Sequence, residues 1–472
     1  MFISNPIAID LGNTNTCCYG LKNGVEFSIP SLRGGVLFPS AVYYRNDFYP
    51  YVGYGAHSCY RRGKSLVLNS KRMIGKSYSD LIHHENLDIF GVPVICGSND
   101  QPYFDLSSVQ EGMMKSAEHV VTDIFKYSLD NSKRFMEADI NKVCIPVPYQ
   151  FNENQRKSIV NALRNSSSSI TEITVISEPS AAVLAYLKDR PHYNSHYLVF
   201  DFGGSTFDVS VVFVSDDAIK VCAYRGDSNL GGITIDRMVA DWMKKLYEKE
   251  TGRPFPSIDM NKKNNPRNNE LKLLAIAEEV KLQLLFMDSA EYIIPLYGDE
   301  DELVFCIPRN QFNYIIRDIP HRILKVVDEC ILAAGIEKED ITDIVFVGGS
   351  TRIPLIQDAV RNHFPNTTEL LFDIDPDVCI AKGALQTFIT NMNILDRSTF
   401  TFEPVIDRNQ KESTLSGDLG LHENVSHKLN VFVHPYVKEL QSTRTIRKAR
   451  MILSTVVVLL LICKNWIWIP IR

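Results

Sequence analysis

Two apolar runs in this chain each end in an aspartate and a glycine turn, and this repetition constrains the fold more than any other feature. The first run covers residues 7–14 and reads Ile-Ala-Ile-Asp-Leu-Gly-Asn-Thr; the second covers 198–208 and reads Leu-Val-Phe-Asp-Phe-Gly-Gly-Ser-Thr-Phe-Asp. A β-strand that ends in Asp and turns on Gly puts a carboxylate beside free backbone N–H groups, which together can hold a phosphate and its magnesium ion. One Asp-Gly turn is ordinary turn chemistry, but two facing copies predict a nucleotide clamp.

The segments around the two turns alternate between strand and helix patterns in a similar order. In the first half, strand patterns at 142–148 and 173–176 each precede a helical pattern, and in the second half a strand pattern at 343–347 does the same. This order predicts an α/β fold with two duplicated lobes, each a mixed sheet flanked by helices, and a ligand cleft beyond the carboxyl ends of the strands. Apolar periodicity also predicts single helices over 111–127 and 311–334.

The same patterns predict the domain limits. A length of 472 residues suits about two to four domains. We expect lobe I over 1–190 with an insert at about 46–110, lobe II over 191–390 with an insert at about 232–310, a divergent tail over 391–450, and an apolar C-terminal segment over 451–472.

Composition indicates an ordinary soluble globular protein. With 50 Lys and Arg against 56 Asp and Glu, the net charge of -6 gives no reason to expect a nucleic-acid partner. The 10 cysteines include no C-x-x-C pair, so they indicate neither a zinc site nor a disulfide framework. The first residues lack the pattern of a secretory signal, and we expect the bulk of the chain to be cytoplasmic.

The C-terminal segment differs from the rest of the chain. Residues 451–463 are almost wholly apolar and follow several basic residues. This run is shorter than the roughly 20 residues that span a bilayer, so a membrane helix would have to continue through Lys464 and Asn465. A tail anchor in a membrane is one interpretation. A helix packed on another subunit and an altered reading frame at the end of the gene are the alternatives.

Three glycine turns supply the candidate phosphate and nucleoside contacts. The second turn offers consecutive backbone donors and two hydroxyls, with Asp201 and Asp208 able to orient magnesium through its water molecules. A third turn, 348–352, again follows a strand and precedes a helix, so a nucleoside could approach its backbone while Arg352 lies against a base. Taken alone, this third turn indicates a tight connection between a strand and a helix; as the third such turn, it favours a ligand contact.

These turns occur in the order found in the actin-like ATPases, and further segments are similar to the heat-shock protein 70 chaperone family. The similar segments are 69–75, 145–148 with 155–156, 177–186, 229–232, 278–281 and 375–384. The resemblance covers about residues 5–390, which is the whole nucleotide-binding domain of that family. It implies an actin-like ATPase fold with ATP or ADP and Mg²⁺ bound in the cleft.

The resemblance also implies a role for each matching residue. Lys71 would approach the γ-phosphate and help place the attacking water, and Glu178 would position water and metal. Asp10 and Asp201 would hold the hydrated metal, and Thr206 would contact the γ-phosphate. Asp201 and Thr206 would both be catalytic residues. Pro148 and Arg156 match the family's interlobe switch. The implied nucleotide-binding residues are Gly12, Asn13, Thr14, Gly203, Gly204, Ser205, Gly231, Gly232, Glu278, Lys281, Gly348, Gly349, Ser350, Arg352 and Asp377.

Several positions depart from the family pattern. Asn13 and Ser205 replace residues that are usual in the two phosphate turns, so we expect slower hydrolysis. Leu282 and Leu285 replace an Arg and a Ser in the adenosine region, so we expect weaker ATP affinity. In the family, a peptide-binding β-sandwich with its helical lid would need roughly 220 to 250 residues after the linker, well above the size of one small domain. Residues 391–472 are far fewer than that. We therefore expect this sequence to lack the family's peptide-binding domain.

Three functions remain in view. The first is a slow ATPase of the heat-shock protein 70 type that acts as a co-chaperone or chaperone partner, with other chaperones, J-domain proteins or exchange factors as its partners. The second is a nucleotide-binding interaction protein that does not hydrolyse ATP. The third, a kinase for a sugar or another small metabolite on the same fold, is the least favoured, because the segments around Lys71 and Glu178 are chaperone-like.

Overall fold

The computed structural model describes residues 5–46, 49–59, 65–191, 193–255, 267–295, 302–395 and 400–402. Met1–Val405 form one compact unit, and the second unit, Ile406–Arg472, lies outside the described residues. The predictions for the apolar segment 451–472 and for most of the tail therefore concern residues that the structure does not describe. Within the described part, no helix has both the length and the hydrophobicity needed to cross a membrane.

The sheet of lobe I is built around the first Asp-ended strand. Strand β1 (Pro6–Leu11) pairs antiparallel with β2 (Asn15–Lys22) and parallel with β11 (Lys142–Val147). Its side chains are buried on both faces except at Asp10, as expected of a central strand. The strand order is β21-β12-β11-β1-β2-β3, with β4 also on β2; the added strands are β3 (Val25–Ile29), β4 (Leu37–Pro39), β12 (Glu172–Ser177) and β21 (Phe400–Phe402).

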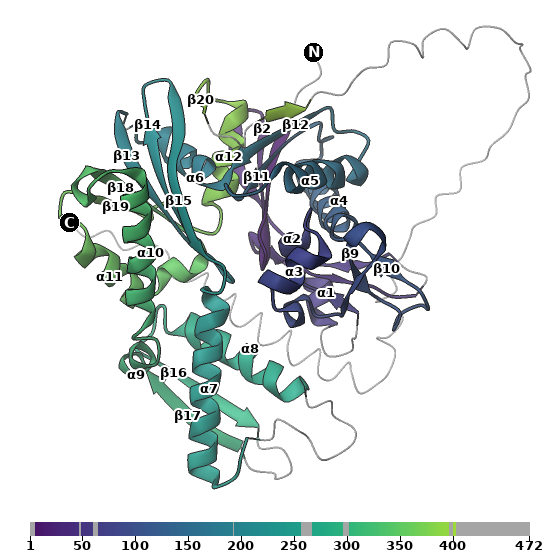
Figure 1. Ribbon diagram of the computed structural model, residues 1–472, viewed down its shortest axis with the longest axis vertical. Coiled ribbons are helices and arrows are strands. Elements are labelled where there is room, and N and C mark those ends of the chain that lie inside the picture. Colours follow the sequence, from purple (N-terminus) through teal and green to yellow (C-terminus); the bar gives the residue numbers. More distant parts are fainter. Residues whose placement is uncertain are drawn as a thin grey trace, which may run out of the picture. The chain divides into compact units, whose positions relative to one another are not determined.

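The sheet of lobe II repeats this arrangement around the second Asp-ended strand. Strand β13 (Ser195–Phe202) pairs antiparallel with β14 (Phe207–Val214) and parallel with β18 (Ile341–Val347). The order is β19-β18-β13-β14-β15-β20, where the added strands are β15 (Ala218–Asp227), β19 (Glu369–Leu371) and β20 (Asn393–Ile394). Because β1 and β13 occupy equivalent places, the predicted duplication is confirmed (Figure 1).

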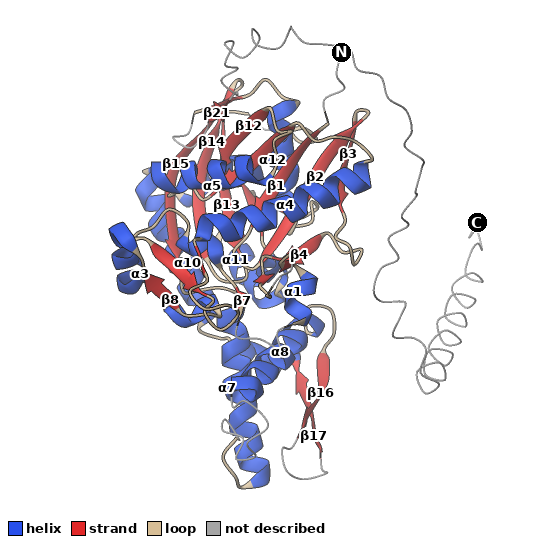
Figure 2. Ribbon diagram, turned by 90° about the vertical axis from the view of Figure 1, so that its right-hand side faces the viewer, coloured by secondary structure: helices blue, strands red, loops and turns tan. Residues whose placement is uncertain are grey.

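Helices cover the faces of both sheets. In lobe I, α4 (Ala117–Met136) and α5 (Glu153–Ser166) lie together over one face, as Figure 2 shows. In lobe II, α10 (Ile319–Ala334) packs on β14 and β15, and α11 (Pro354–His363) packs beside α10. Each lobe has its own apolar core, so the fold is the predicted α/β type with helices flanking two mixed sheets.

Two crossing helices join the lobes. Helix α6 (Glu178–Leu187) follows the lobe I strand β12 but packs on β13, β14 and β15 of lobe II. Helix α12 (Cys379–Leu385) follows the lobe II strands but packs on β1, β2 and β11 of lobe I. The two backbones touch, because a Cβ added to Gly383 would lie 1.7 Å from the Ala181 carbonyl oxygen. A third apolar core surrounds this crossing and includes residues from both sheets.

Each lobe also carries a small addition to its sheet. In lobe I it contains the short strands β5 (Val42–Tyr43), β6 (Tyr51–Val52), β7 (Leu66–Val67), β8 (Val94–Cys96), β9 (Pro102–Asp105) and β10 (Met114–Lys115), with helices α1 (Tyr54–Ser58), α2 (Ser70–Met73) and α3 (Tyr78–His84). In lobe II it contains α7 (Gly232–Thr251), α8 (Arg267–Gln283), the hairpin β16 (Ser289–Pro295) and β17 (Glu302–Pro308), and α9 (Arg309–Ile315). The predicted numerical limits of the lobes and inserts stay predictions.

Two predicted helices are wrong in their extent. The helix predicted over 111–127 begins only at Ala117, because the Ser116 side chain caps α4 by accepting from the His119 N–H, and residues 114–115 belong to β10. The helix predicted over 311–334 is two helices, α9 and α10. Pro320 lies in the first turn of α10, where its missing N–H costs nothing, and therefore favours a new start there.

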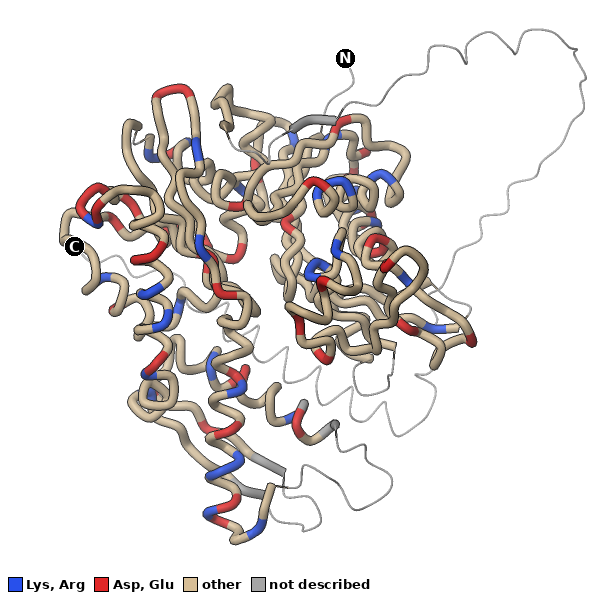
Figure 3. The backbone as a smooth tube through the Cα atoms, viewed as in Figure 1, with Lys and Arg blue, Asp and Glu red and all other residues tan. Residues whose placement is uncertain are grey.

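Charges of both signs are interspersed along both lobes. Figure 3 shows Lys and Arg as well as Asp and Glu distributed over both lobes. The chain has a formal net charge of only -6. Any strong local potential must therefore come from particular groups.

Candidate functional site

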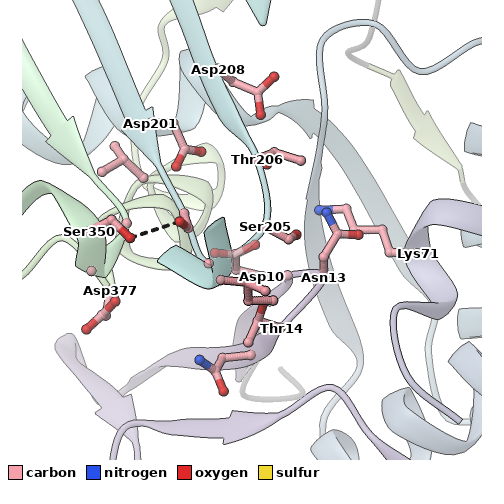
Figure 4. A pocket seen from close by; sticks show the side chains of 18 of the residues that line it. Asp10, Asn13, Thr14, Lys71, Asp201, Ser205, Thr206, Asp208, Ser350 and Asp377 are labelled. Atoms are coloured by element: carbon pink, nitrogen blue, oxygen red, sulfur yellow. Dashed lines mark hydrogen bonds between the residues drawn. The ribbon is translucent and has the colours of Figure 1, made fainter. Parts of the chain in front are cut away.

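A pocket of about 550 Å³ lies where the carboxyl ends of the two central strands meet, within the size range of ligand sites. All of the predicted site residues except Gly231 and Gly232 line it. They are Asp10, Gly12, Asn13, Thr14, Lys71, Glu178, Asp201, Gly203, Gly204, Ser205, Thr206, Glu278, Lys281, Gly348, Gly349, Ser350, Arg352 and Asp377. Figure 4 shows that side chains of both lobes point into this space, with Asp10, Asn13 and Lys71 facing Asp201, Ser205 and Thr206.

The two phosphate turns have the same backbone closure. The Gly12 N–H donates to the Asn15 carbonyl at 3.0 Å, and the Gly203 N–H donates to the Thr206 carbonyl at 3.1 Å. A Cβ at Gly12 would lie 2.3 Å from the Asn15 oxygen, so only glycine permits this turn. The turns also approach each other closely, because a Cβ at Gly204 would lie 2.6 Å from the Thr14 hydroxyl oxygen.

The first turn presents polar atoms that have no protein partner. Among the described residues, Asn13 Oδ1 and Thr14 Oγ1 are buried without a hydrogen bond. Buried polar atoms normally have partners, and a ligand or ordered water is the usual explanation where they do not. A Thr hydroxyl can donate to a phosphate oxygen, so these atoms fit a phosphate-binding turn.

Three partly buried carboxylates, those of Asp10, Asp201 and Asp208, gather beside the turns. Burial raises the pKa of Asp10 to about 7, with Glu178 and Asp377 adding to the rise and Lys71 opposing it. Burial and the neighbouring Asp208 raise the pKa of Asp201 well above its usual value. Burial likewise raises the pKa of Asp208 to about 6, although a hydrogen bond from Tyr224 opposes the shift. Crowded carboxylates that resist ionisation indicate a place where a bound cation would be stabilised.

Lys71 and Glu178 form an ion pair on the lobe I side of the pocket. The Lys71 ammonium donates to Glu178 Oε1 at 2.6 Å, and both side chains are largely buried. Burial lowers the pKa of Lys71, but Glu178 and Asp10 outweigh it, so the pKa is raised overall and the group stays charged. Glu178 is the first residue of α6, and Lys71 lies in α2; each of these helices follows a strand. A fixed ammonium beside a carboxylate can place a water molecule and stabilise negative charge.

The third turn is built against the second. A Cβ at Gly348, whose φ is 82°, would lie 2.5 Å from the Phe202 carbonyl oxygen, so the backbones touch there. The Ser350 hydroxyl donates to the Gly203 carbonyl at 3.0 Å, the contact drawn in Figure 4. The Arg352 guanidinium is held by Asp377 at 2.6 Å and also by Asp375. The turn therefore has a fixed geometry, and the contact of Arg352 with a base stays a prediction.

Gly231 and Gly232 support the second turn instead of lining the pocket. The Gly232 N–H donates to the Gly203 carbonyl at 3.0 Å. A Cβ at Gly231 would lie 2.6 Å from the Ser205 carbonyl carbon. Their small size is therefore explained by packing against the phosphate turn.

A hydrated magnesium ion fits this donor set better than a directly ligated metal. Within the described residues, no three His, Cys, Asp or Glu side chains are grouped so that they could hold one metal ion. Mg²⁺ commonly keeps several of its waters and takes one or two carboxylates together with phosphate oxygens. Asp10 and Asp201, on opposite sides of the pocket, suit that form of binding.

Several residues around the site were missed by sequence reasoning. Tyr224 donates to Asp208 at 2.5 Å, and its ring lies 6.2 Å from that of Tyr149 in lobe I. Asp236 pairs with Lys281 at 2.8 Å, and Arg72 donates to two carbonyls of lobe II. No spacing or motif links these partners in the sequence. Only the position of Arg72 next to Lys71 could have drawn attention to it.

The comparison with protein families agrees with this geometry. A family model described as Hsp70 protein matches residues 6–404 of the chain. The match covers both sheets, the crossing helices and every residue that lines the pocket.

Proposed function

The chain belongs to the Hsp70 family, and from this membership we propose that it binds ATP with magnesium and hydrolyses it slowly to ADP and phosphate. Hsp70 family membership suggests an ATP-binding, chaperone-like function, and proteins of the family bind ATP or ADP with magnesium. The observation that carries the proposed hydrolysis is the Lys71–Glu178 pair at 2.6 Å on the wall of the pocket that Asp10 and Asp201 also line.

In the proposed mechanism, the residues of the chain position the reactants and stabilise charge. The backbone donors of the two turns and the Thr14 hydroxyl would bind phosphate oxygens. Asp10 and Asp201 would hold a hydrated magnesium ion, which neutralises phosphate charge when bound. Glu178 would orient the attacking water, and the Lys71 ammonium would stabilise the charge that develops on the phosphoryl group.

The slow rate is part of the proposal. Asn13 and Ser205 stand in the phosphate turns where the family resemblance leads us to expect other residues. The extra side chain of Ser205 lies in the pocket beside Thr206. A shift of a phosphate by about 1 Å can cost on the order of 100-fold in rate, so small changes of these turns support slow turnover.

A single-turnover experiment tests the proposal. Purified full-length protein is mixed with substoichiometric labelled ATP and magnesium, and the rate is compared with that of Lys71→Ala. We expect the variant to be slower by about 100-fold or more, because removing one preorganised charge-stabilising donor costs about 10² to 10³ in rate. Lys157→Ala, an exposed residue of α5, is the control and should match the wild type. Equal hydrolysis rates for the wild type and Lys71→Ala would contradict the proposed ATPase activity.

One observation favours a nucleotide-binding protein that does not hydrolyse ATP. Leu282 lines the pocket with half of its side chain exposed, and it offers neither charge nor hydrogen bond there. Weak retention of the nucleoside would suit an interaction protein more than an ATPase. In the single-turnover experiment this alternative predicts ATP binding without phosphate release above the background.

We further infer that its partners are other chaperones, J-domain proteins or exchange factors, and that it works in the cytoplasm. Family membership supports chaperone partners in general. Adding a purified J-domain protein to the single-turnover assay tests the first inference, which predicts faster hydrolysis. Fractionation of cells that express the tagged full-length chain tests the second, and recovery with membranes would contradict it.

A further inference from the structure

Arg72 connects the two lobes beside the pocket. It lies on α2 of lobe I, directly after Lys71, and its side chain is only 10% exposed. One terminal nitrogen, Nη1, donates to Glu85 Oε2 of the same lobe at 2.8 Å. The other, Nη2, donates to two main-chain carbonyls of lobe II, Ser228 at 2.7 Å and Ser205 at 3.0 Å.

The two carbonyls belong to one rigid piece of lobe II. Ser205 is part of the second phosphate turn, and Ser228 precedes the Gly231-Gly232 start of α7. These segments are bonded to each other, because the Gly232 and Ile233 N–H groups donate to the Gly203 and Gly204 carbonyls at 3.0 and 2.7 Å. A displacement of Ser228 would therefore also displace the second phosphate turn, which lines the pocket.

Glu85 fixes the guanidinium from the lobe I side. Its second oxygen accepts from Lys76 at 3.0 Å, and its side chain is 9% exposed. The hydrogen bond of Nη1 to this carboxylate orients the planar guanidinium, so that the other nitrogen points at lobe II. A lysine at this position has no planar fork and could not reach the carboxylate and both carbonyls with the same geometry.

The contact closes one side of the same pocket. Arg72, Glu85, Ser205 and Ser228 all line it. The lobes are also joined by the crossing of α6 and α12, where the two backbones lie in close contact. Opening of the pocket by rotation about that crossing would have to break the bonds of Arg72 to lobe II.

We propose that Arg72, Glu85 and the carbonyls of Ser205 and Ser228 form an interlobe clasp, in which Arg72 is a positioning residue that holds the pocket closed and limits the release of nucleotide. In this clasp, Arg72 contacts the second phosphate turn and so positions that turn in the pocket. Because Arg72 and Lys71 are neighbours on α2, it also fixes the lobe I ammonium relative to lobe II. The proposed effect on nucleotide release rests on the nucleotide binding proposed above. The proposed closure of the pocket does not depend on it.

Hydrogen exchange of the full-length protein without nucleotide tests the closure. In Arg72→Ala we expect amides of residues 203–206 and 228–233 to exchange at least tenfold faster than in the wild type, with the rest of the chain unchanged. Lys76→Ala removes the other cation on Glu85 while the bonds of Arg72 to lobe II remain, so it should leave these amides within about twofold of the wild type. If Arg72→Ala does not fold, Arg72→Lys replaces it, with an expected rise of at least threefold.

Unchanged exchange in the two segments would overturn the clasp, and so would an increase spread evenly over both lobes, since that would indicate only lost stability. A second readout is the dissociation rate of ADP that carries a methylanthraniloyl group, which we expect to rise at least tenfold in Arg72→Ala. An unchanged dissociation rate would also contradict the proposal. If the wild type binds no nucleotide, the proposed function fails, while the exchange experiment still decides whether the clasp exists.

Discussion

A single pair of residues, Lys281 and Asp236, illustrates how the site depends on buried charge. The Lys281 ammonium lies 2.8 Å from Asp236 Oδ1, and both side chains are about nine-tenths buried. Burial raises the pKa of Asp236 to about 6, although Lys281 opposes the shift. A carboxyl group whose folded-state pKa is raised favours folding at low pH, and this contribution is lost as the pH rises through that pKa.

Lys281→Met should therefore destabilise the protein in a pH-dependent manner. At pH 7.5 it leaves an unpaired buried carboxylate, and we expect a loss of about 3 kcal/mol in the free energy of unfolding. Without the ammonium the pKa of Asp236 rises further, so the group is protonated at pH 5 and the loss should fall to about 1 kcal/mol. Urea unfolding at both pH values measures it. Lys325→Met, at an exposed helical site, is the control, and a loss that is equal at both pH values would contradict the argument.

The individual residues of the site differ in how well the sequence predicts them. Glycine turns after strands are local signals, so the sequence alone predicts the turns at Gly12, Gly203 and Gly348. Tyr224, Asp236 and Arg72 act through partners that are distant in the sequence, and only the fold brings these partners together. A single sequence contains no pattern that records such contacts.

Among the elements, the crossing of α6 and α12 leaves the least space for a side chain at its contact point. Gly383 lies in α12, and a Cβ there would lie 1.7 Å from the Ala181 carbonyl oxygen, so one backbone would have to move. We expect Gly383→Ala to reduce the free energy of unfolding by at least about 2 kcal/mol. Gly55 in α1 is the matched control, since a Cβ there would meet nothing closer than 3.6 Å.

The control has the opposite expected sign. Alanine is favoured over glycine within a helix by about 1 kcal/mol, so Gly55→Ala should be neutral or slightly stabilising. Thermal and urea unfolding of both variants give the comparison. A Gly383→Ala protein as stable as the wild type would show that the two helices can separate without cost, and the joint between the lobes would then be looser than the structure indicates.

The elements also show where local patterns mislead. The apolar pattern at 111–127 begins before the first residue of α4, Ala117. An apolar pattern contains no information about the Ser116 cap or about the pairing of residues 114–115 with β9. The apolar period over 311–334 likewise runs across the break between α9 and α10. By contrast, central strands such as β1 and β13 were predicted well, since a short apolar run between turn residues has few alternatives.

At the scale of the whole molecule, a ligand in the pocket would contact both lobes. The pocket takes one wall from each lobe, and Asp10 and Asp201 reach it from equivalent central strands. The duplication of the fold could be predicted from the two Asp-ended runs. The way in which the lobes are held together, by crossing helices and by Arg72, could not, because neither leaves a repeated pattern in the sequence.

A ligand that bridges the lobes should stabilise the molecule as one unit, and the effect should depend on magnesium. Saturation at 100 times the dissociation constant adds about 2.7 kcal/mol, which differential scanning calorimetry detects as a higher melting temperature. We expect ATP with magnesium to raise the melting temperature more than ATP with EDTA. Asp10→Asn and Asp201→Asn should lose only the magnesium-dependent part, because the backbone donors of the turns remain, whereas Asp139→Asn at an exposed site should behave as the wild type. If both site variants kept the full magnesium-dependent rise, the two carboxylates that end the central strands would not be the groups that hold the metal.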